Sequence, residues 1–224
     1  MTDSALPPCS TPVRPGKVLA LGRTYRAHAI ELGNSPPPEP LVFNKLPDTI
    51  VPSGSRVTIP TDAAGVLDHE AELAVVIGAT AWRLGPGDAR AHIAGYTICN
   101  DLTMRAVQKV AKENGWPWLR AKNFPGSCPI GPTVTPVSAV PDPGDLVITC
   151  RVNGDLRQEA NTRDLSWTVF ELVEWLSHRW VLYPGDVIST GTPAGVGTLR
   201  AGDTCAISIR GPSVDLGTLI TEFA

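Results

Sequence analysis

The stretch Asp68-His69-Glu70-Ala71-Glu72-Leu73-Ala74-Val75-Val76-Ile77-Gly78 decides how this chain folds. Its second half is apolar and rich in β-branched residues, which is typical of a strand. Side chains two apart on a strand share a face, so Glu70 and Glu72 point the same way and His69 points away from both. Neighbouring carboxylates beside apolar residues repel each other and are costly to desolvate. A hard divalent cation between them is one interpretation, and an edge strand with two solvated glutamates is the other.

The composition is that of an ordinary globular protein. The 224 residues are enough for one sizeable domain or two small ones, with 42% hydrophobic and 18% charged residues. A net charge of −3 without a basic block argues against binding to nucleic acid or to a membrane surface, and no apolar run approaches the length of a membrane helix. The proline-rich start lacks a signal-peptide core. We expect a flexible N-terminal arm over residues 1–16 and a single domain over 17–224.

The five cysteines are widely scattered, and no C-x-x-C motif occurs. The sequence therefore suggests neither a zinc site nor a disulfide framework. Most of the cysteines are expected to be small buried residues, and the pattern fits the reducing cytoplasm.

Short apolar runs separated by turn signals predict a β-rich fold. Nearly the same turn sequence occurs at Pro86-Gly87-Asp88, Pro143-Gly144-Asp145, Pro184-Gly185-Asp186 and Ala201-Gly202-Asp203. The pair Asn153-Gly154 after an apolar run is a strong hairpin signal. Helical patterns are few and short, and the clearest covers residues 169–177.

A histidine and a glutamate share one face of a short helix predicted over residues 26–33. His28 and Glu31 are three apart, and a carboxylate beside an imidazole orients it and raises its basicity, as a general base requires. A solvated salt bridge on a surface turn is the alternative. The helix precedes a proline-rich loop, residues 34–40, and is placed to move as a lid.

Polar residues also follow a second buried strand. Asp101 stands where the strand of residues 95–101 meets a helix predicted over 102–114, so it is either a site residue or a helix cap. On that helix Arg105 and Gln108 share a face, which suits carboxylate binding or a plain polar surface. Lys122 is a site cation or a surface lysine. Lys45 is a site residue or an ordinary surface lysine, and its local sequence favours the surface lysine.

Taken in order, these segments resemble the fumarylacetoacetate hydrolase family from about residue 18 to 209. The series runs Gly22-Arg23-Thr24-Tyr25 with His28 and Glu31, Phe43-x-Lys45, His69-Glu70-Ala71-Glu72-Leu73, Asn100-Asp101 with Arg105 and Gln108, Lys122, Val152-Asn153-Gly154 with Arg157-Gln158, and Pro184 to Pro193. The resemblance implies a mixed α/β but β-rich fold, a β-roll of mostly antiparallel strands with a few short helices, and a homodimer.

The resemblance also assigns the site residues. It implies that Mg²⁺, or Mn²⁺ or Ca²⁺, is held by Glu70, Glu72 and Asp101. It makes His28 with Glu31 the pair that activates water, and it makes Lys122 a catalytic cation beside the developing enolate. Substrate binding falls to Arg23, Tyr25, Arg105, Gln108 and Thr192. Thr24 replaces the asparagine of many members, and the tail 211–217 departs from the usual ending.

The short chain and the stretch 101–129 resemble the acylpyruvase and oxaloacetate decarboxylase branch. Three carboxylates leave about three of six octahedral positions open for a 2-oxo acid. The expected reaction is hydrolysis of a C–C bond in a 3-acylpyruvate, with His28 deprotonating the water and pyruvate enolate leaving. Oxaloacetate decarboxylation, isomerisation or decarboxylation of an unsaturated 2-oxo dicarboxylate, and a catalytically silent binding homologue are the alternatives.

Overall fold

The computed structural model describes residues 15–31, 33, 37–63 and 66–224. Most of the predicted arm, and residues 34–36 of the predicted loop, lie outside the described residues. The strands are β1 (Val18–Gly22), β2 (Leu41–Lys45), β3 (Ile50–Pro52), β4 (Ser55–Val57), β5 (Leu67–His69), β6 (Ala71–Ile77), β7 (Ile93–Asn100), β8 (Thr103–Met104), β9 (Cys128–Ile130), β10 (Thr135–Pro136), β11 (Val147–Val152), β12 (Asp155–Asn161), β13 (Val187–Ser189), β14 (Gly197–Leu199), β15 (Thr204–Gly211) and β16 (Val214–Phe223). The α-helices are α1 (Arg26–Glu31), α2 (Arg105–Glu113), α3 (Leu119–Lys122) and α4 (Val169–Ser177).

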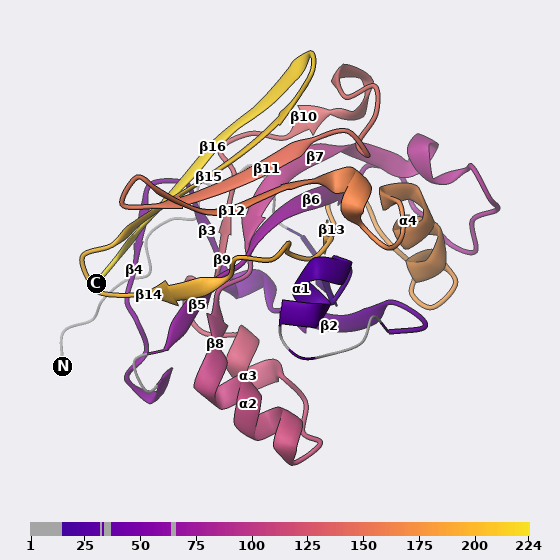
Figure 1. Cartoon of the computed structure of the whole chain (residues 1–224). Helices are drawn as coiled ribbons and strands as arrows, with labels where there is room; N and C mark the ends of the chain where they lie inside the picture. Colours follow the sequence, from indigo (N-terminus) through magenta and orange to yellow (C-terminus); the bar gives the residue numbers. More distant parts are fainter. Residues whose placement is uncertain (1–14, 32, 34–36, 64–65) are drawn as a thin grey trace.

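The strands form three sheets (Figure 1). The largest has the order β2-β1-β13-β6-β7-β9-β3, with β10 added beside β7. The second has the order β12-β11-β15-β16-β4, and the third is β14-β5-β8. Among the described residues, β1 with β13, β3 with β9 and β4 with β16 are parallel pairs, and the other pairings are antiparallel. The predicted β-rich, mostly antiparallel fold is confirmed.

Strand β6 is the middle strand of the largest sheet, and both of its faces are buried. Leu73, Val75 and Ile77 join the large core between the two main sheets. Ala74 and Val76 join a smaller core on the opposite face. The alternation predicted from the sequence is therefore correct, and it fixes the register of the strand, since a slip of one residue would exchange its two faces.

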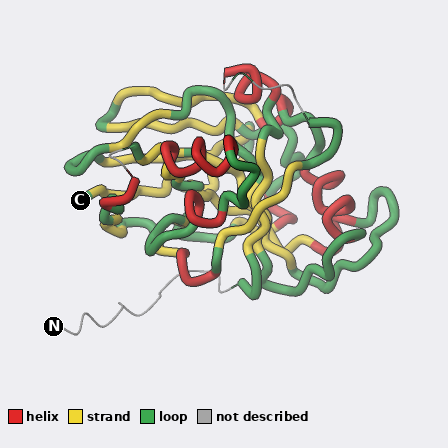
Figure 2. The backbone as a smooth tube through the Cα atoms, turned by 90° about the horizontal axis from the view of Figure 1, so that it is seen from below, coloured by secondary structure: helices red, strands yellow, loops and turns green. Residues whose placement is uncertain are grey.

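The helices are short and lie around the strands (Figure 2). Helix α4 has the predicted bounds and opens with a capping box formed by Thr168 and Glu171. Helix α2 begins later than predicted, at Arg105 rather than residue 102. The reason is that Thr103 and Met104 pair with β5 as strand β8, so a tertiary contact overrides the local helical pattern.

The Asn153-Gly154 turn closes the hairpin of β11 and β12, with φ of 54° and 89° as this turn requires. None of the helices in the described residues is both long and apolar enough to cross a membrane.

Candidate metal centre and active site

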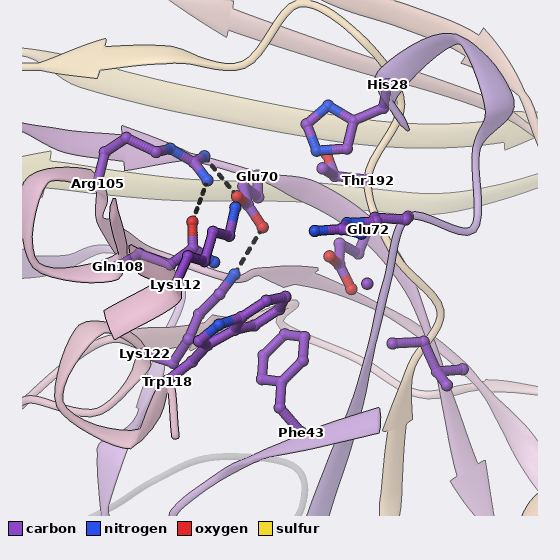
Figure 3. A pocket seen from close by; sticks show the side chains of 13 residues that line it. His28, Phe43, Glu70, Glu72, Arg105, Gln108, Lys112, Trp118, Lys122 and Thr192 are labelled. Carbon is purple, nitrogen blue, oxygen red and sulfur yellow. Dashed lines mark hydrogen bonds and ion pairs between the residues drawn. The ribbon is translucent and has the colours of Figure 1, made fainter. Parts of the chain in front are cut away.

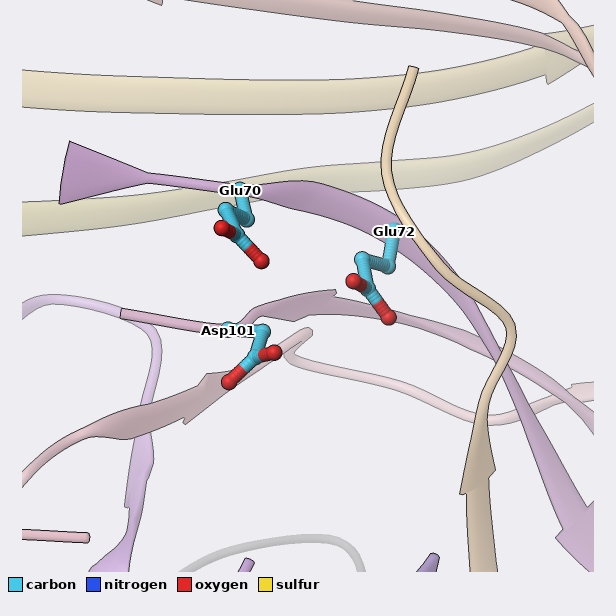
Figure 4. Close-up of side chains that lie close together, drawn as sticks. All are labelled: Glu70, Glu72 and Asp101. Atoms are coloured by element: carbon cyan, nitrogen blue, oxygen red, sulfur yellow. The ribbon is translucent and has the colours of Figure 1, made fainter. Parts of the chain in front are cut away.

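Three carboxylates converge near the start of β6 (Figure 4). Glu70 lies between β5 and β6, Glu72 is the second residue of β6, and Asp101 follows the last residue of β7. One carboxylate oxygen of each lies within 4.8 Å of the others, and all three residues are buried. Strand pairing brings them together, because Ala71 lies opposite Asn100 and the Asp101 amide donates to the Glu70 carbonyl at 2.9 Å.

Two buried lysines neutralise part of this negative charge. Lys122 Nζ donates to Glu70 Oε2 at 2.8 Å and to Asp101 Oδ2 at 2.6 Å. Lys45 Nζ lies 2.8 Å from Asp101 Oδ1 without hydrogen-bond alignment, and it donates to the Leu102 carbonyl at 3.2 Å. The ammonium of Lys122 also lies 4.6 Å from the centre of the Phe43 ring, a cation–π contact.

Arg105 makes three hydrogen bonds on the other side of Glu70. Its guanidinium donates to Glu70 Oε1 at 2.6 Å, to Asp68 Oδ2 at 2.7 Å and to Gln108 Oε1 at 2.8 Å. These contacts place Arg105 as a support for the Glu70 carboxylate. Substrate binding by Arg105 and Gln108 stays a prediction.

The pKa values of the two glutamates, Glu70 and Glu72, are shifted in opposite directions. Burial alone would raise the pKa of Glu70, but the charges of Lys122 and Arg105 hold it below its usual range. Burial, followed by the charge of Asp101, raises the pKa of Glu72 well above its usual range. Glu72 is therefore the carboxylate that lacks a counter-charge. Three oxygen donors, one of them without a cation, fit a hard divalent ion.

The segment after β13 holds the uncompensated glutamate. Glu72 Oε2 accepts from the Gly191 amide at 2.9 Å and from the Ser189 hydroxyl. Gly191 has φ of 96°, and a Cβ there would lie 1.9 Å from Thr24 Oγ1. A side chain at this position would displace the amide from Glu72.

A pocket opens beside Glu70 and Glu72 (Figure 3). It is lined by Leu21, Gly22, Arg23, His28, Phe43, Glu70, Glu72, Arg105, Gln108, Lys112, Trp118, Lys122 and Thr192. His28 and Thr192 lie on one side, and Arg105, Gln108 and Lys112 lie on the other. His28 Nδ1 contacts Glu31 Oε2 at 3.0 Å, which leaves Nε2 for a bound molecule.

Most residues predicted from the sequence meet at this site, but Tyr25 does not. Its side chain is 1% exposed in the main core and does not line the pocket. Burial raises its pKa. Two residues away, Arg23 lines the pocket with φ of 58°, an uncommon backbone for a non-glycine residue. We therefore carry Arg23, and not Tyr25, into the proposed substrate site.

Several neighbours of the site were not identified from their local pattern. The interpretation of Lys45 as a surface residue is wrong, because its side chain is fully buried against Asp101. Asp68, Lys112 and Trp118 were given no role, although Asp68 pairs with Arg105 and the other two line the pocket. The spacing Phe43-x-Lys45, part of the family resemblance, was the only sequence feature that could have indicated a site role for Lys45. His69 faces away from the glutamates as predicted, and its Nδ1 contacts Gln158 Oε1 at 3.0 Å.

Comparison with known proteins agrees with this geometry. The family model described as fumarylacetoacetate (FAA) hydrolase C-terminal matches residues 17–224. An uncharacterized protein of Pyrococcus horikoshii is 44% identical over 89% of this chain and 86% of its own length. The oxaloacetate tautomerase YisK of Bacillus subtilis is 40% identical over 93% of this chain and 70% of its own length.

Among solved structures, fumarylpyruvate hydrolase from Pseudomonas aeruginosa in complex with Mn²⁺ and pyruvate superposes with a TM-score of 0.88. It is 35% identical, and the match covers 95% of this chain and 91% of that one. Both the family model and this fold match span nearly the whole chain. The chain belongs to the fumarylacetoacetate hydrolase family.

Proposed function

We propose that this protein is a divalent-metal-dependent enzyme that acts on a 2-oxo acid through its enolate, and that keto–enol tautomerisation of oxaloacetate is its main reaction. The observation that carries the proposal is that His28, which is paired with Glu31, lines the same pocket as Glu70 and Glu72 of the carboxylate cluster. Support also comes from relatives named oxaloacetate tautomerase, which are 40–42% identical. One of these, from Bos taurus, is matched over only 59% of its length.

The residues that would hold Mg²⁺ or Mn²⁺ are Glu70, Glu72 and Asp101. When bound, the ion would polarise the 2-oxo group and stabilise negative charge on its oxygen. The Mn²⁺ in the fumarylpyruvate hydrolase structure supports a divalent ion here. The choice between Mg²⁺, Mn²⁺ and Ca²⁺ stays open, since all accept oxygen ligands.

The side chains then share the proton chemistry. In enolisation, His28 Nε2 takes a proton from C3 of the 2-oxo acid and delivers it to the 2-oxygen; in ketonisation, it takes the proton of the enol 2-hydroxyl and delivers it to C3. Glu31 holds the imidazole through Nδ1. Lys122, whose raised pKa keeps it charged beside Asp101 and Glu70, places positive charge next to the enolate oxygen. Arg23 and Thr192 orient the substrate from the pocket wall.

Hydrolysis of a 3-acylpyruvate is the second candidate, and the same pair favours it. A histidine held by a carboxylate would equally deprotonate a water for attack on the distal carbonyl, and cleavage of the C–C bond would release pyruvate enolate. Fumarylpyruvate hydrolase is a relative whose name states this type of reaction.

A substrate panel tests the proposal. Enzyme loaded with Mg²⁺ or Mn²⁺ is assayed for oxaloacetate tautomerisation and decarboxylation, and for cleavage of acetylpyruvate, fumarylpyruvate and fumarylacetoacetate. We expect tautomerisation to be fastest and to fall in His28→Ala. Faster cleavage of an acylpyruvate would favour the second candidate. Failure to bind Mn²⁺ or to turn over any of the four acids would favour a silent homologue. The homodimer also stays a prediction, which light scattering checks.

A further inference from the structure

The loop of residues 191–195, between β13 and β14, contacts both Glu72 of β6 and Glu31, the partner of the proposed base. We call it the 191–195 loop. Its first residue binds Glu72, as described above. Its last residue, Gly195, donates its amide to Glu31 Oε1 at 2.9 Å. The other oxygen of Glu31 contacts His28. One backbone segment therefore reaches a proposed metal ligand and the carboxylate that orients the proposed base.

The hold on Glu31 matters because its side chain is 34% exposed. An ion pair with that exposure contributes little by itself, and a long side chain in solvent has several rotamers. The Gly195 amide fixes the second carboxylate oxygen, so the carboxylate is held at both oxygens. A restrained carboxylate presents His28 Nδ1 with one acceptor position, and the imidazole orientation follows from it.

The 191–195 loop is in turn fixed by Gln158 of β12. The Gln158 side-chain amide donates to Thr192 Oγ1 at 2.7 Å and to the Pro193 carbonyl at 2.9 Å. Its carbonyl oxygen lies 3.1 Å from the Ala71 amide, which donates to it, and 3.0 Å from His69 Nδ1. Gln158 is 1% exposed. It therefore ties the loop to the backbone between the two glutamates.

Close packing makes this arrangement specific to glycine at residue 195. Gly195 has φ of 95°, and a Cβ there would lie 2.1 Å from the Arg157 carbonyl oxygen and 3.3 Å from the Gln158 Cα. A contact of 2.1 Å cannot be accommodated without moving the loop away from β12. The loop thus lies directly on the backbone of the strand that carries Gln158.

We propose that Gln158 and Gly195 are positioning residues for the reaction. Gln158 fixes the position of the 191–195 loop relative to β6, and the Gly195 amide fixes the orientation of His28 through Glu31. The inference rests on the proposed role of His28 as the base. Proton transfer from carbon needs the base within hydrogen-bond reach of the reacting atom, and a displacement of about 1 Å costs about 10²-fold in rate.

Gly195→Ala tests the proposal, and Gly202→Ala is its matched control. Gly202 has nearly the same backbone, φ of 93°, but a Cβ there meets nothing within 4 Å. Both variants are loaded with Mn²⁺ and assayed for oxaloacetate tautomerisation, and hydrogen exchange of α1 is measured by mass spectrometry. Glu31→Ala and the double variant Glu31→Ala/Gly195→Ala complete the set. Glu31→Ala changes a partly exposed side chain and is expected to fold.

We expect Gly195→Ala to lower kcat by about 10²-fold, with a smaller change in KM, and to speed exchange in α1. Gly202→Ala should stay within about twofold of the wild type in both measurements. Adding Gly195→Ala to Glu31→Ala should cost less than Gly195→Ala costs in the wild type, since part of its effect acts through Glu31. Loss of protection of the 191–195 loop in Glu31→Ala is a second expected result.

The proposal is overturned if Gly195→Ala behaves like Gly202→Ala, or if the effects of Gly195→Ala and Glu31→Ala multiply. Failure of the proposed function gives a different result. If the wild type turns over no 2-oxo acid, the role of His28 as base falls. The exchange of α1 in Gly195→Ala against Gly202→Ala then still decides whether the Gly195 amide restrains Glu31.

Discussion

Replacing Lys45 with methionine isolates the buried ion pair that supports Asp101. Both side chains are fully buried, with Lys45 Nζ 2.8 Å from Asp101 Oδ1. Breaking a buried pair by removing one partner costs about 3–5 kcal/mol, because the remaining charge is left uncompensated. Lys122 keeps one cation on Asp101, which places the loss at the lower end. We expect Lys45→Met to lose about 3 kcal/mol of unfolding free energy.

For a chain of this length, each kcal/mol lowers the melting temperature by about 2–4 °C, so the expected shift is about 6–12 °C. Urea unfolding in the presence of a metal chelator measures the loss without a contribution from bound ions. Lys109→Met is the matched control, because it breaks an exposed ion pair. The Lys109 side chain is 76% exposed, and its Nζ lies 3.9 Å from Glu113 Oε1. It should change stability by about 0.5 kcal/mol or less.

A double-mutant cycle with Asp101→Asn separates the pair from general packing effects. We expect a coupling energy of at least about 1 kcal/mol between the two positions. A loss below about 1 kcal/mol in Lys45→Met, together with no coupling, would refute the reasoning. It would mean that Asp101 does not depend on Lys45 for its charge compensation.

Three further predictions concern the carboxylates and the pocket. Glu72→Gln should weaken Mn²⁺ binding at least about 10–100-fold by calorimetry, while the exposed control Glu222→Gln should not. The pKa of Glu72 is raised in the metal-free protein, so the contribution of Glu72 to stability is present below its unfolded pKa and is lost as pH rises through its folded pKa. Metal binding should then release a proton from Glu72, which calorimetry detects as a heat that depends on the buffer. Absence of proton release would contradict the raised pKa. Lys112 lines the pocket, and desolvation together with Arg105 and Arg23 lowers its pKa to about 8. Lys112 therefore loses its positive charge above about pH 8. The KM for oxaloacetate should rise above that pH in the wild type and in Lys109→Gln, but not in Lys112→Gln.

The β6 register and the shared face of Glu70 and Glu72 were predictable because both follow from a short-range rule. Side chains two apart on a strand share a face, and a strand end places the next side chain at the sheet edge. Glu70 and Glu72 needed only that alternation. Asp101 joins them through the pairing of β6 with β7, which the structure shows, whereas at the level of sequence only the family resemblance named Asp101 as a ligand.

Other parts of the site depend on tertiary contacts that no local pattern records. A lysine is rarely buried without a partner, and the partner of Lys45 lies 56 residues away. The start of α2 was missed because β5 recruits the two residues before it. The motif groups Tyr25 with Arg23, but Tyr25 packs in the main core whereas Arg23 lines the pocket.

The lysine between Glu70 and Asp101 has a consequence for the order of events during biosynthesis. Lys122 supplies positive charge to two of the three carboxylates from within the chain itself. A polypeptide that carries its own counter-ions need not wait for a metal before it folds, unlike small domains whose folding energy comes from the ion. With the proposed metal dependence, we therefore expect metal-starved cells to accumulate folded, inactive protein rather than aggregates, and restored metal supply to activate it without new synthesis.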